Sequence, residues 1–282
     1  MNEPSLRKAV EGKTKAIYQY TNHPHLCVVE SSDRISGGDG KRKDVIPGKG
    51  ALSNRTTCNV FRLLERHGLP LAFINELGPN KFFAEYTEMI PLEVVTRGFA
   101  RGSYRKRHPE VPLDTPFTPP IVELYLKTTG KKWKGIELPC DDPILEPIDK
   151  HNPENGFRAY RPDEPVSGKA RTPCVPLVTF KDLGLEQGEL RHVEHLGRET
   201  FVVLQPAFAK EKGRLIDMKE EVGRSVATGE LLISDVVDND SWRVVFEGVD
   251  VSKQGYRDGD DLETVKSRYE FVAKLTDSFR DN

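Results

Sequence analysis

Short apolar runs separated by turns dominate the first hundred residues. These runs are rich in branched and aromatic side chains, which is typical of strands. We predict strands at four places: 16–20, 26–30, 71–77 and 89–100. One helix is predicted between them, over 52–67, because Val60, Leu63 and Leu64 fall on one face. The order of elements predicts a mixed α and β protein.

Two stretches show neither a helical nor a strand period. Residues 31–54 are rich in glycine and charge, and we predict a long exposed loop there. Residues 139–176 are rich in proline, and we predict irregular surface structure there. The second stretch is interpreted as an insertion, at about 143–187, and not as a domain.

The last hundred residues predict two helices around a hairpin. The first helix is expected at about 188–210, although Pro206 is expected to kink or end it early. The hairpin is expected to join 214–223 to 230–237, and the second helix to cover 261–279.

Composition narrows the class of protein. Forty-two Lys+Arg face 44 Asp+Glu in 282 residues, a formal charge of −2, so no overall positive charge favours nucleic acid as the partner. Four scattered cysteines lack zinc-ligand spacing and predict a reducing compartment. No apolar run reaches the roughly 20 residues needed to span a bilayer. We expect a cytoplasmic protein without a membrane partner.

The predicted hairpin carries the first candidate chemistry. Asp217, Lys219 and Glu221 alternate along one strand, so their side chains share a face. Asp235 interrupts the apolar partner strand, where a buried carboxylate needs compensation. A magnesium ion would supply it between Glu221 and Asp235. A surface ion pair between Lys219 and Glu221 is an equally good interpretation of this pattern alone.

Arginines supply the second candidate chemistry. Residues 96–107 combine several arginines with Gly102 and Ser103, which suits a phosphate monoester, although a solvated basic turn or a nucleic-acid strip fits the same letters. Arg243 and Arg257 follow the acidic hairpin. Lys13 and Lys15 alternate before an apolar run, so both ammonium groups share one face.

Taken in order, several motifs resemble the SAICAR synthetase family. The motifs are EGKTKAIY, SGGDG, GKGALSN, EMIPLEVVTRGFARGS, VELYLK, DDP, LIDMKEEVG, LLISDVVDNDSWR and KQGYRD. The resemblance implies an ATP-dependent ligase that joins carboxyaminoimidazole ribotide (CAIR) to L-aspartate in purine biosynthesis, by way of an acyl phosphate. It also implies an α+β fold of two lobes, a mostly antiparallel N-terminal lobe at 1–88 and a larger lobe at 89–282, with ATP in the cleft between them.

The resemblance further implies site residues. ATP contacts are expected at Lys13, Lys15, Met89 and Lys219, and magnesium ligands at Glu221 and Asp235. CAIR contacts are expected at Arg97, Ser103, Arg243 and Arg257, with Asp217 near the imidazole. Lys127 is expected near the reacting centre, and Gly38 and Asp39 near the aspartate. A homo-oligomer is expected from the same resemblance.

Three features depart from the family pattern. Gly98 stands where asparagine is common, Arg101 replaces a small residue, and the proline-rich insertion is longer than in typical members. These departures keep open a diverged ligase that acts on another azole carboxylate. A second alternative is a non-catalytic protein on the same scaffold that binds a nucleotide or nucleic acid.

Overall fold

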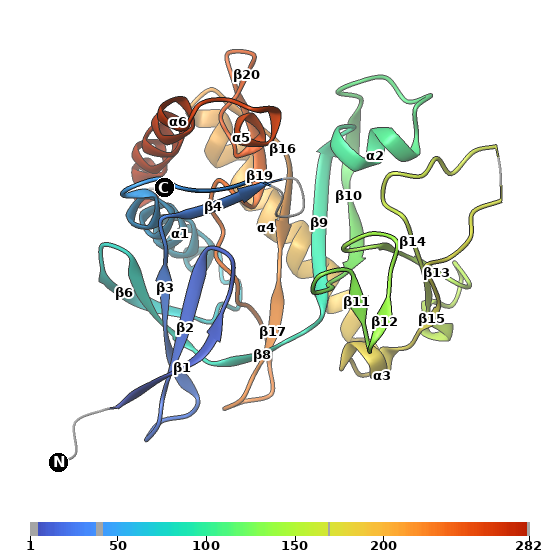
Figure 1. Ribbon diagram of the computed structural model, residues 1–282, viewed down its shortest axis with the longest axis horizontal. Coiled ribbons are helices and arrows are strands. Elements are labelled where there is room, and N and C mark those ends of the chain that lie inside the picture. The colour runs from blue at the N-terminus through green and yellow to red at the C-terminus, as the bar shows by residue number, and fades with distance from the viewer. Residues whose placement is uncertain (1–4, 38–41, 169, 281–282) are drawn as a thin grey trace. The chain divides into compact units, whose positions relative to one another are not determined.

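The computed structural model describes residues 5–37, 42–168 and 170–280, and its chain divides into two compact units (Figure 1). The first unit comprises Met1–Met89, Val202–Leu215 and Gly223–Asn282, and the second comprises Ile90–Phe201 and Ile216–Val222. The predicted lobes, 1–88 and 89–282, remain a prediction about where nucleotide and substrate bind. The compact units group the chain differently, because the C-terminal residues pack with the N-terminal ones.

An antiparallel sheet of five strands forms the first unit's N-terminal part. Its order is β1-β2-β3-β7-β6, with bounds Leu6–Glu11, Lys15–Tyr20, Leu26–Ser31, Lys81–Glu85 and Phe73–Gly78. Three aromatic rings fill the core between this sheet and helix α1, with Phe61, Phe73 and Phe82 centred 5.5–6.0 Å apart. The three strands predicted before residue 80 are confirmed.

Helix α1 covers Lys49–Arg66 and confirms the predicted helix with an earlier start. The Asp33 carboxylate accepts hydrogen bonds from the backbone N–H groups of Gly48 and Gly50, at 3.0 and 2.8 Å. These bonds satisfy donors that a helix N-terminus leaves unpaired. A cap supplied by a residue 15 positions away in the chain explains why the local pattern placed the start too late.

The prediction of a loop over 31–54 is wrong in part. Strands β4 (Arg34–Gly37) and β5 (Arg42–Val45) form a hairpin there. Ile35 and Ile46 are buried in a cluster with Tyr256, and burial of such side chains stabilises a strand that the surrounding glycines disfavour. Gly38 and Asp39 lie outside the residues that the structure describes.

The predicted acidic hairpin has different partners. Strand β16 (Gly213–Glu220) pairs with β9 and not with the following apolar run. The hairpin joins β17 (Val222–Ser225) to β18 (Leu231–Ile233), and β8 (Thr87–Met89) lies beside β17. Glu221 directly precedes β17 and Asp235 follows β18 by two residues.

The rest of the first unit is C-terminal. Strands β19 (Trp242–Phe246) and β20 (Val249–Asp250) form an antiparallel pair, followed by α5 (Gln254–Asp258), α6 (Leu262–Leu275) and a 3-10 helix at Thr276–Arg280. The closing helix is therefore confirmed, with a tighter last turn. Helix α6 packs its buried Val265, Tyr269 and Val272 inward, as its 3.6-residue period predicts.

One antiparallel sheet organises the second unit, in the order β15-β14-β13-β10-β9-β16 (Figure 1). Its other strands are β9 (Leu92–Phe99), β10 (Pro116–Leu126), β13 (Ile144–Pro147), β14 (Phe157–Tyr160) and β15 (Val175–Val178). The prediction of irregular structure over 139–176 is thus wrong in part. Prolines end β13 and sit in the outermost strand β15, positions where a missing N–H is tolerated.

Five short elements complete the described part of the second unit. They are α2 (Gly102–Arg107), the pair β11 (Lys132–Trp133) and β12 (Ile136–Glu137), a 3-10 turn (Pro153–Asn155) and α3 (Phe180–Leu183). Within the ranges that the structure describes, no helix of the chain is both long and apolar enough to cross a membrane.

Helix α4 (Glu189–Lys210) covers the apolar face of β9. The helix passes through Pro206 without ending, because Leu204 and Phe208 on either side are fully buried. Gly197 permits the close approach, since a Cβ there would lie 2.5 Å from a Val94 methyl group. Val94 therefore faces the helix, and the neighbouring odd-numbered residues of β9 face away from it.

Glu220 is the exception on this apolar face. It is 2% exposed, and neither carboxyl oxygen has a hydrogen-bond partner among the residues that the structure describes. Burial raises the pKa of Glu220 from its ordinary 4.5 to about 7. The folded chain therefore keeps a proton that the unfolded chain releases, and stability should fall as the pH rises from 4.5 to about 7.

We predict that Glu220→Gln stabilises the protein at pH 8 by about 1–3 kcal/mol, because glutamine keeps the shape and cannot ionise. At pH 5 the variant and the wild type should unfold alike. Urea unfolding at both pH values measures this difference. Glu137→Gln is the control, since that side chain is 84% exposed. Equal gains for both variants at pH 8 would contradict the explanation.

Candidate active site

Two lysines and two glutamates meet on the polar face of the second unit's sheet. Lys219 Nζ lies 2.8 Å from a Glu93 oxygen and 3.0 Å from a Glu221 oxygen. Lys127 Nζ pairs with Glu221 and lies 3.6 Å from Glu93. We call Glu93, Lys127, Lys219 and Glu221 the lysine–carboxylate cluster. The structure thus brings together three residues predicted for catalysis or metal binding.

Charge pairing decides the protonation of this cluster. Burial alone would lower the pKa of Lys219, but the carboxylates of Glu93 and Glu221 outweigh it and hold that pKa above its usual value. Burial alone would raise the pKa of Glu93, but Lys219 and Lys127 hold it below its usual value. Lys219 is therefore an ammonium group at neutral pH, able to attract phosphate oxygens.

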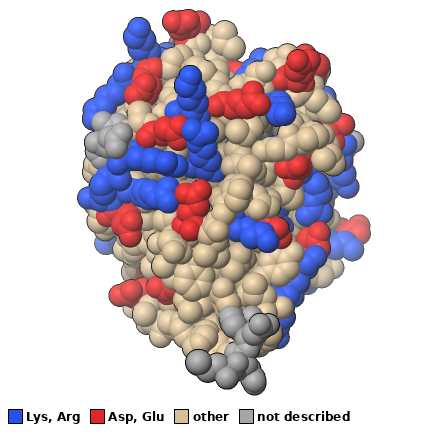
Figure 2. Space-filling model, turned by 90° about the vertical axis from the view of Figure 1, so that its left-hand side faces the viewer, with Lys and Arg blue, Asp and Glu red and all other residues tan. Residues whose placement is uncertain are grey.

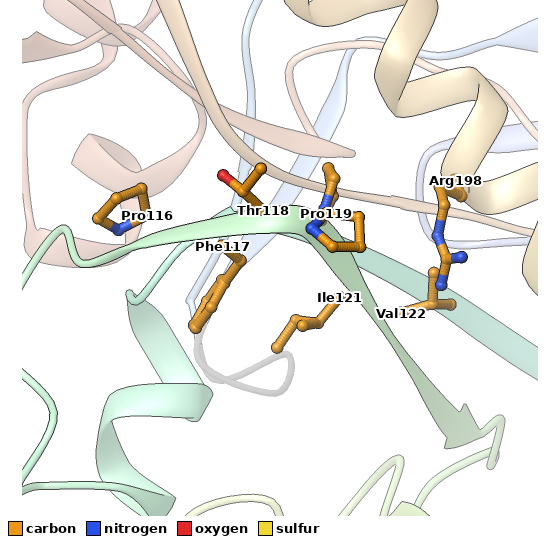
Figure 3. Close-up of a pocket in the computed structure, with 8 residues that line it drawn as sticks. Pro116, Phe117, Thr118, Pro119, Ile121, Val122 and Arg198 are labelled. Carbon is orange, nitrogen blue, oxygen red and sulfur yellow. The ribbon is translucent and has the colours of Figure 1, made fainter.

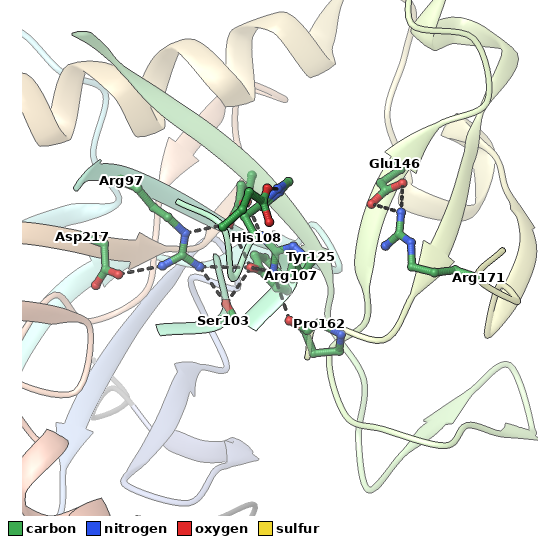
Figure 4. A network of polar contacts seen from close by, with 11 residues as sticks. Arg97, Ser103, Arg107, His108, Tyr125, Glu146, Pro162, Arg171 and Asp217 are labelled. Carbon is green, nitrogen blue, oxygen red and sulfur yellow. Dashed lines mark hydrogen bonds and ion pairs between the residues drawn. The ribbon is translucent and has the colours of Figure 1, made fainter. Parts of the chain in front are cut away.

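A second polar group lies on the same face around Arg97 (Figure 4). Its Nη1 donates to Asp217 at 2.6 Å and its Nε donates to Glu123 at 2.7 Å. Its Nη2 donates to Ser103 at 2.9 Å and to the Tyr125 hydroxyl at 3.0 Å. We call these five residues the arginine group. Arg97, Ser103 and Asp217, all predicted as substrate contacts, are in hydrogen-bond contact.

Strand register explains why the two groups share a face. Asp217 stands opposite Arg97 across β16 and β9, and Tyr125 stands opposite Glu93 across β10 and β9. Side chains two residues apart on a strand point the same way. The alternation therefore gives one row of charged and hydroxyl groups across three strands.

Arg101 does not join the arginine group. Its guanidinium forms a two-bond pair with Asp114, one bond being 2.7 Å from Nη2. Asp114 adopts a left-handed conformation, with φ 61°, and its N–H bonds to the Ala100 carbonyl. Arg101, which departs from the family pattern, therefore has a nearby carboxylate partner. Asp114 offsets the additional positive charge.

Two first-unit residues predicted for nucleotide and metal are in contact with each other. Lys15, at the start of β2, forms an ion pair with Asp235, and both side chains are mostly buried. Lys13 is exposed just before the strand. Met89 ends β8 with 42% of its surface exposed. Lys13 lies in the turn between β1 and β2, so the strand alternation expected for the two lysines does not apply to it, and only Lys15 is directed at a carboxylate.

Arg243 lies in β19 and Arg257 in α5, where it is exposed. The loop before β19 is fixed by Asp240, which lies 3.0 Å from Lys253 Nζ and 3.8 Å from Lys49 Nζ. Burial would raise the pKa of Asp240, but Lys49 and Lys253 hold it well below its usual range. The carboxylate therefore stays charged and anchors the loop that leads to Arg243.

The predicted metal ligands fit a metal that arrives with a nucleotide. Both Glu221 and Asp235 are carboxylates held by lysines. Throughout the described part of the chain, no three His, Cys, Asp or Glu side chains are grouped as a metal site. Magnesium commonly takes one or two carboxylates and completes its coordination with phosphate oxygens and water. Each carboxylate could therefore supply one oxygen ligand to a magnesium ion held by a nucleotide, and among the described residues neither belongs to a complete protein cage.

Two surface features stand apart from these groups. An open groove of about 630 Å³ lies between Arg198 of α4 and residues 116–122 of β10 (Figure 3). It contains none of the predicted site residues. On the face shown in Figure 2, basic and acidic side chains are interspersed, in keeping with the net charge of −2.

Several residues that form the polar contacts described above were not predicted from the sequence. Glu93 and Tyr125 lie inside runs that read as apolar strands, and Lys49 lies at a helix start. The sequence did contain a signal for Glu93. Glu93 and Arg97 are both charged and lie four residues apart in β9, so the two-residue period of a strand places them on the same face. For Lys49 no local signal existed, because its partner Asp240 is far away in the chain.

Comparisons with known proteins agree with the motifs. The family model described as SAICAR synthetase matches residues 8–136 and 167–275. The synthase of Roseiflexus castenholzii, named phosphoribosylaminoimidazole-succinocarboxamide synthase, is 36% identical over 280 residues, covering 96% of this chain and 97% of that protein. The chain belongs to the SAICAR synthetase family. Residues 137–166, which the family model leaves unmatched, fall largely within the predicted insertion.

Other SAICAR synthetase relatives are more distant. The human bifunctional phosphoribosylaminoimidazole carboxylase/succinocarboxamide synthetase is 33% identical, covering 95% of this chain and 57% of that protein. A solved SAICAR synthetase in complex with ADP is 25% identical, with a TM-score of 0.74 and coverage of 97% and 98%. The crystal structure of the Ehrlichia chaffeensis synthase has a TM-score of 0.75 at 24% identity, covering 96% and 98%. The predicted α+β fold is confirmed.

We predict that Glu93→Gln lowers the free energy of unfolding by about 2 kcal/mol at pH 7, because it leaves two partly buried ammonium groups with one carboxylate. Since pairing lowers the pKa of Glu93, this loss should vanish as the pH falls well below 4.5, where the wild type protonates. Urea unfolding across this pH range measures the loss. Glu137→Gln, which breaks a solvent-exposed pair with Lys132, should cost less than about 1 kcal/mol. Equal losses would contradict the account.

Proposed function

We propose that this chain is an ATP-dependent, amide-forming ligase that condenses CAIR with L-aspartate to give SAICAR, ADP and phosphate in purine biosynthesis. Membership of the SAICAR synthetase family supports the reaction class. The observation that carries the proposal is the row of charges on β10, β9 and β16, where lysines adjoin an arginine group. ADP in a similar solved synthetase supports the use of ATP.

The proposed chemistry has two steps. A CAIR carboxylate oxygen attacks the γ-phosphorus of ATP, and the bond from that phosphorus to ADP breaks. The amine of aspartate then attacks the acyl carbon, a carbon–nitrogen bond forms, and phosphate leaves with the former carboxylate oxygen while the amine loses a proton. The first step makes a good leaving group from a poor electrophile, and each step depends on aligned reactants and offset charge.

Residue roles follow for each substrate. We assign ATP contacts to Lys13, Lys15, Met89 and Lys219, and CAIR contacts to Arg97, Ser103, Arg243 and Arg257. Asp217 would lie by the imidazole, Lys127 would adjoin the transferred phosphoryl group, and Gly38 and Asp39 would contact aspartate. The two cationic lysines of the cluster support the phosphoryl role, because ammonium groups offset the charge that develops in transfer.

Magnesium is the proposed companion of ATP. Glu221 of the second unit and Asp235 of the first are each proposed as a ligand. When bound, the ion would neutralise phosphate oxygens and orient the γ-phosphoryl group. The lysines that now hold these carboxylates would then be released toward phosphate. A cytoplasmic location and a homo-oligomeric state are further expectations.

We predict ADP release that needs all of CAIR, L-aspartate, ATP and magnesium together. A coupled assay measures ADP in the complete mixture and after single omissions. Each omission should lower the rate to background, because no single substrate completes the transfer. Release equal to the background ATPase in the complete mixture would contradict the proposal, and release with another azole carboxylate in place of CAIR would favour the diverged ligase.

We predict that Asp235→Asn raises the magnesium concentration for half-maximal rate by about tenfold, because an amide is a weaker ligand than a carboxylate. Titration of magnesium at saturating ATP, CAIR and aspartate measures it. Asp163→Asn is the control, since that carboxylate pairs with Arg161 at the surface. If both variants needed the same magnesium as the wild type, Asp235 would not be a ligand.

A further inference from the structure

The hydroxyl of Tyr125 is the common point of the arginine group (Figure 4). It accepts hydrogen bonds from Arg97 Nη2 at 3.0 Å and from Arg107 Nη1 at 3.1 Å. It donates to Glu123 Oε2 at 2.9 Å, and Ser103 Oγ lies 3.0 Å away. One oxygen thus contacts two of the groups assigned to CAIR, Arg97 and Ser103.

Glu123 joins the same two arginines from the other side. It accepts from Arg97 Nε at 2.7 Å and also pairs with Arg107. The two arginines are 3% and 1% exposed, so loss of a carboxylate partner would leave a buried charge unpaired. Burial would raise the pKa of Glu123, but Arg97 and Arg107 hold it below its usual range. The carboxylate is therefore a fixed negative charge between them.

This arrangement sets the direction of the Arg97 guanidinium. Its bonds to Glu123, Asp217, Ser103 and Tyr125 use four of the five guanidinium N–H groups and reach all three nitrogens, which leaves one Nη1 N–H for a substrate. A planar guanidinium bonded at several edges has one orientation, which is what recognition of a phosphate requires. Tyr125 and Ser103 both accept from Nη2, so Tyr125 helps to fix the edge of the guanidinium that Ser103 contacts.

Arg107 links the group to the insertion. Its Nη1 donates to the Pro162 carbonyl at 3.1 Å, and its own carbonyl accepts from the Val166 N–H at 2.9 Å. Residues 161–166 of the insertion are therefore tied to the end of α2, whose first turn carries Ser103. The insertion thus supports the proposed CAIR site from outside the family-matched segments.

We propose that Tyr125 is a positioning residue for CAIR, which holds Arg97 and Ser103 in the arrangement that binds the ribotide phosphate, with Arg107 and residues 161–166 supporting it. The proposal rests on the proposed function, since it assumes that Arg97 and Ser103 contact CAIR. It assigns no direct contact with substrate to Tyr125. Loss of the Tyr125 hydroxyl should therefore weaken the binding of CAIR and leave the binding of ATP and L-aspartate unchanged, because only CAIR is proposed to contact the arginine group.

The test is Tyr125→Phe, which removes one oxygen and keeps the ring. We expect the KM for CAIR to rise about tenfold, as for a lost hydrogen bond to a charged group. The KM values for ATP and L-aspartate should stay within about twofold. Tyr160→Phe is the matched control, since that ring lies in β14 and stacks on Arg171 at 4.3 Å. Circular dichroism and thermal unfolding verify that both variants fold.

The possible results separate the two claims. A wild type that makes no ADP in response to CAIR would overturn the proposed function and this inference together. An active wild type with an unchanged KM for CAIR in Tyr125→Phe would overturn only the inference. A fall in kcat alone would also overturn it, since a purely structural role reduces the active fraction without changing KM.

Discussion

Charge pairing on the polar face of β10, β9 and β16 is the constraint on which the site depends. Arg97, Lys219 and Glu93 lie in a sheet whose other face is covered by α4, so an unpaired charge there would cost several kcal/mol. Each cation therefore has a carboxylate partner and each carboxylate a cation. The pairing fixes positions in the free protein and leaves ammonium and guanidinium groups next to one another for anionic substrates.

The alternation of the strands separates packing from chemistry. Even-numbered residues of β9, such as Val94, meet α4, whereas odd-numbered ones such as Glu93 and Arg97 face away from it. A register slip of one residue would exchange the two sets and bury the charges against the helix. Fold stability and the placement of the proposed site therefore depend on the same strand register. Glu220 of β16 lies on the helix side, opposite the row of charges, and burial there raises its pKa.

The sequence allowed prediction of what is local and periodic. The helices around 52–67, 188–210 and 261–279 and the shared face of Asp217, Lys219 and Glu221 follow from spacing alone. Strand partners could not be predicted in this way: β16 pairs with β9, distant in the chain, and not with the next apolar run. The contact of Tyr125 with Arg97 depends on a further pairing, that of β10 with β9. Likewise strands β4 and β5 pair where Ile35 is buried in a cluster with Tyr256, a contact that no local pattern contains.

The central claim is that this polar face activates a ribotide carboxylate by phosphoryl transfer. The direct test uses CAIR with oxygen-18 in its carboxylate, turned over with ATP and L-aspartate, and mass spectrometry of the released phosphate. Passage through an acyl phosphate predicts that each phosphate carries one carboxylate oxygen. Phosphate without label, alongside normal formation of the amide, would contradict it.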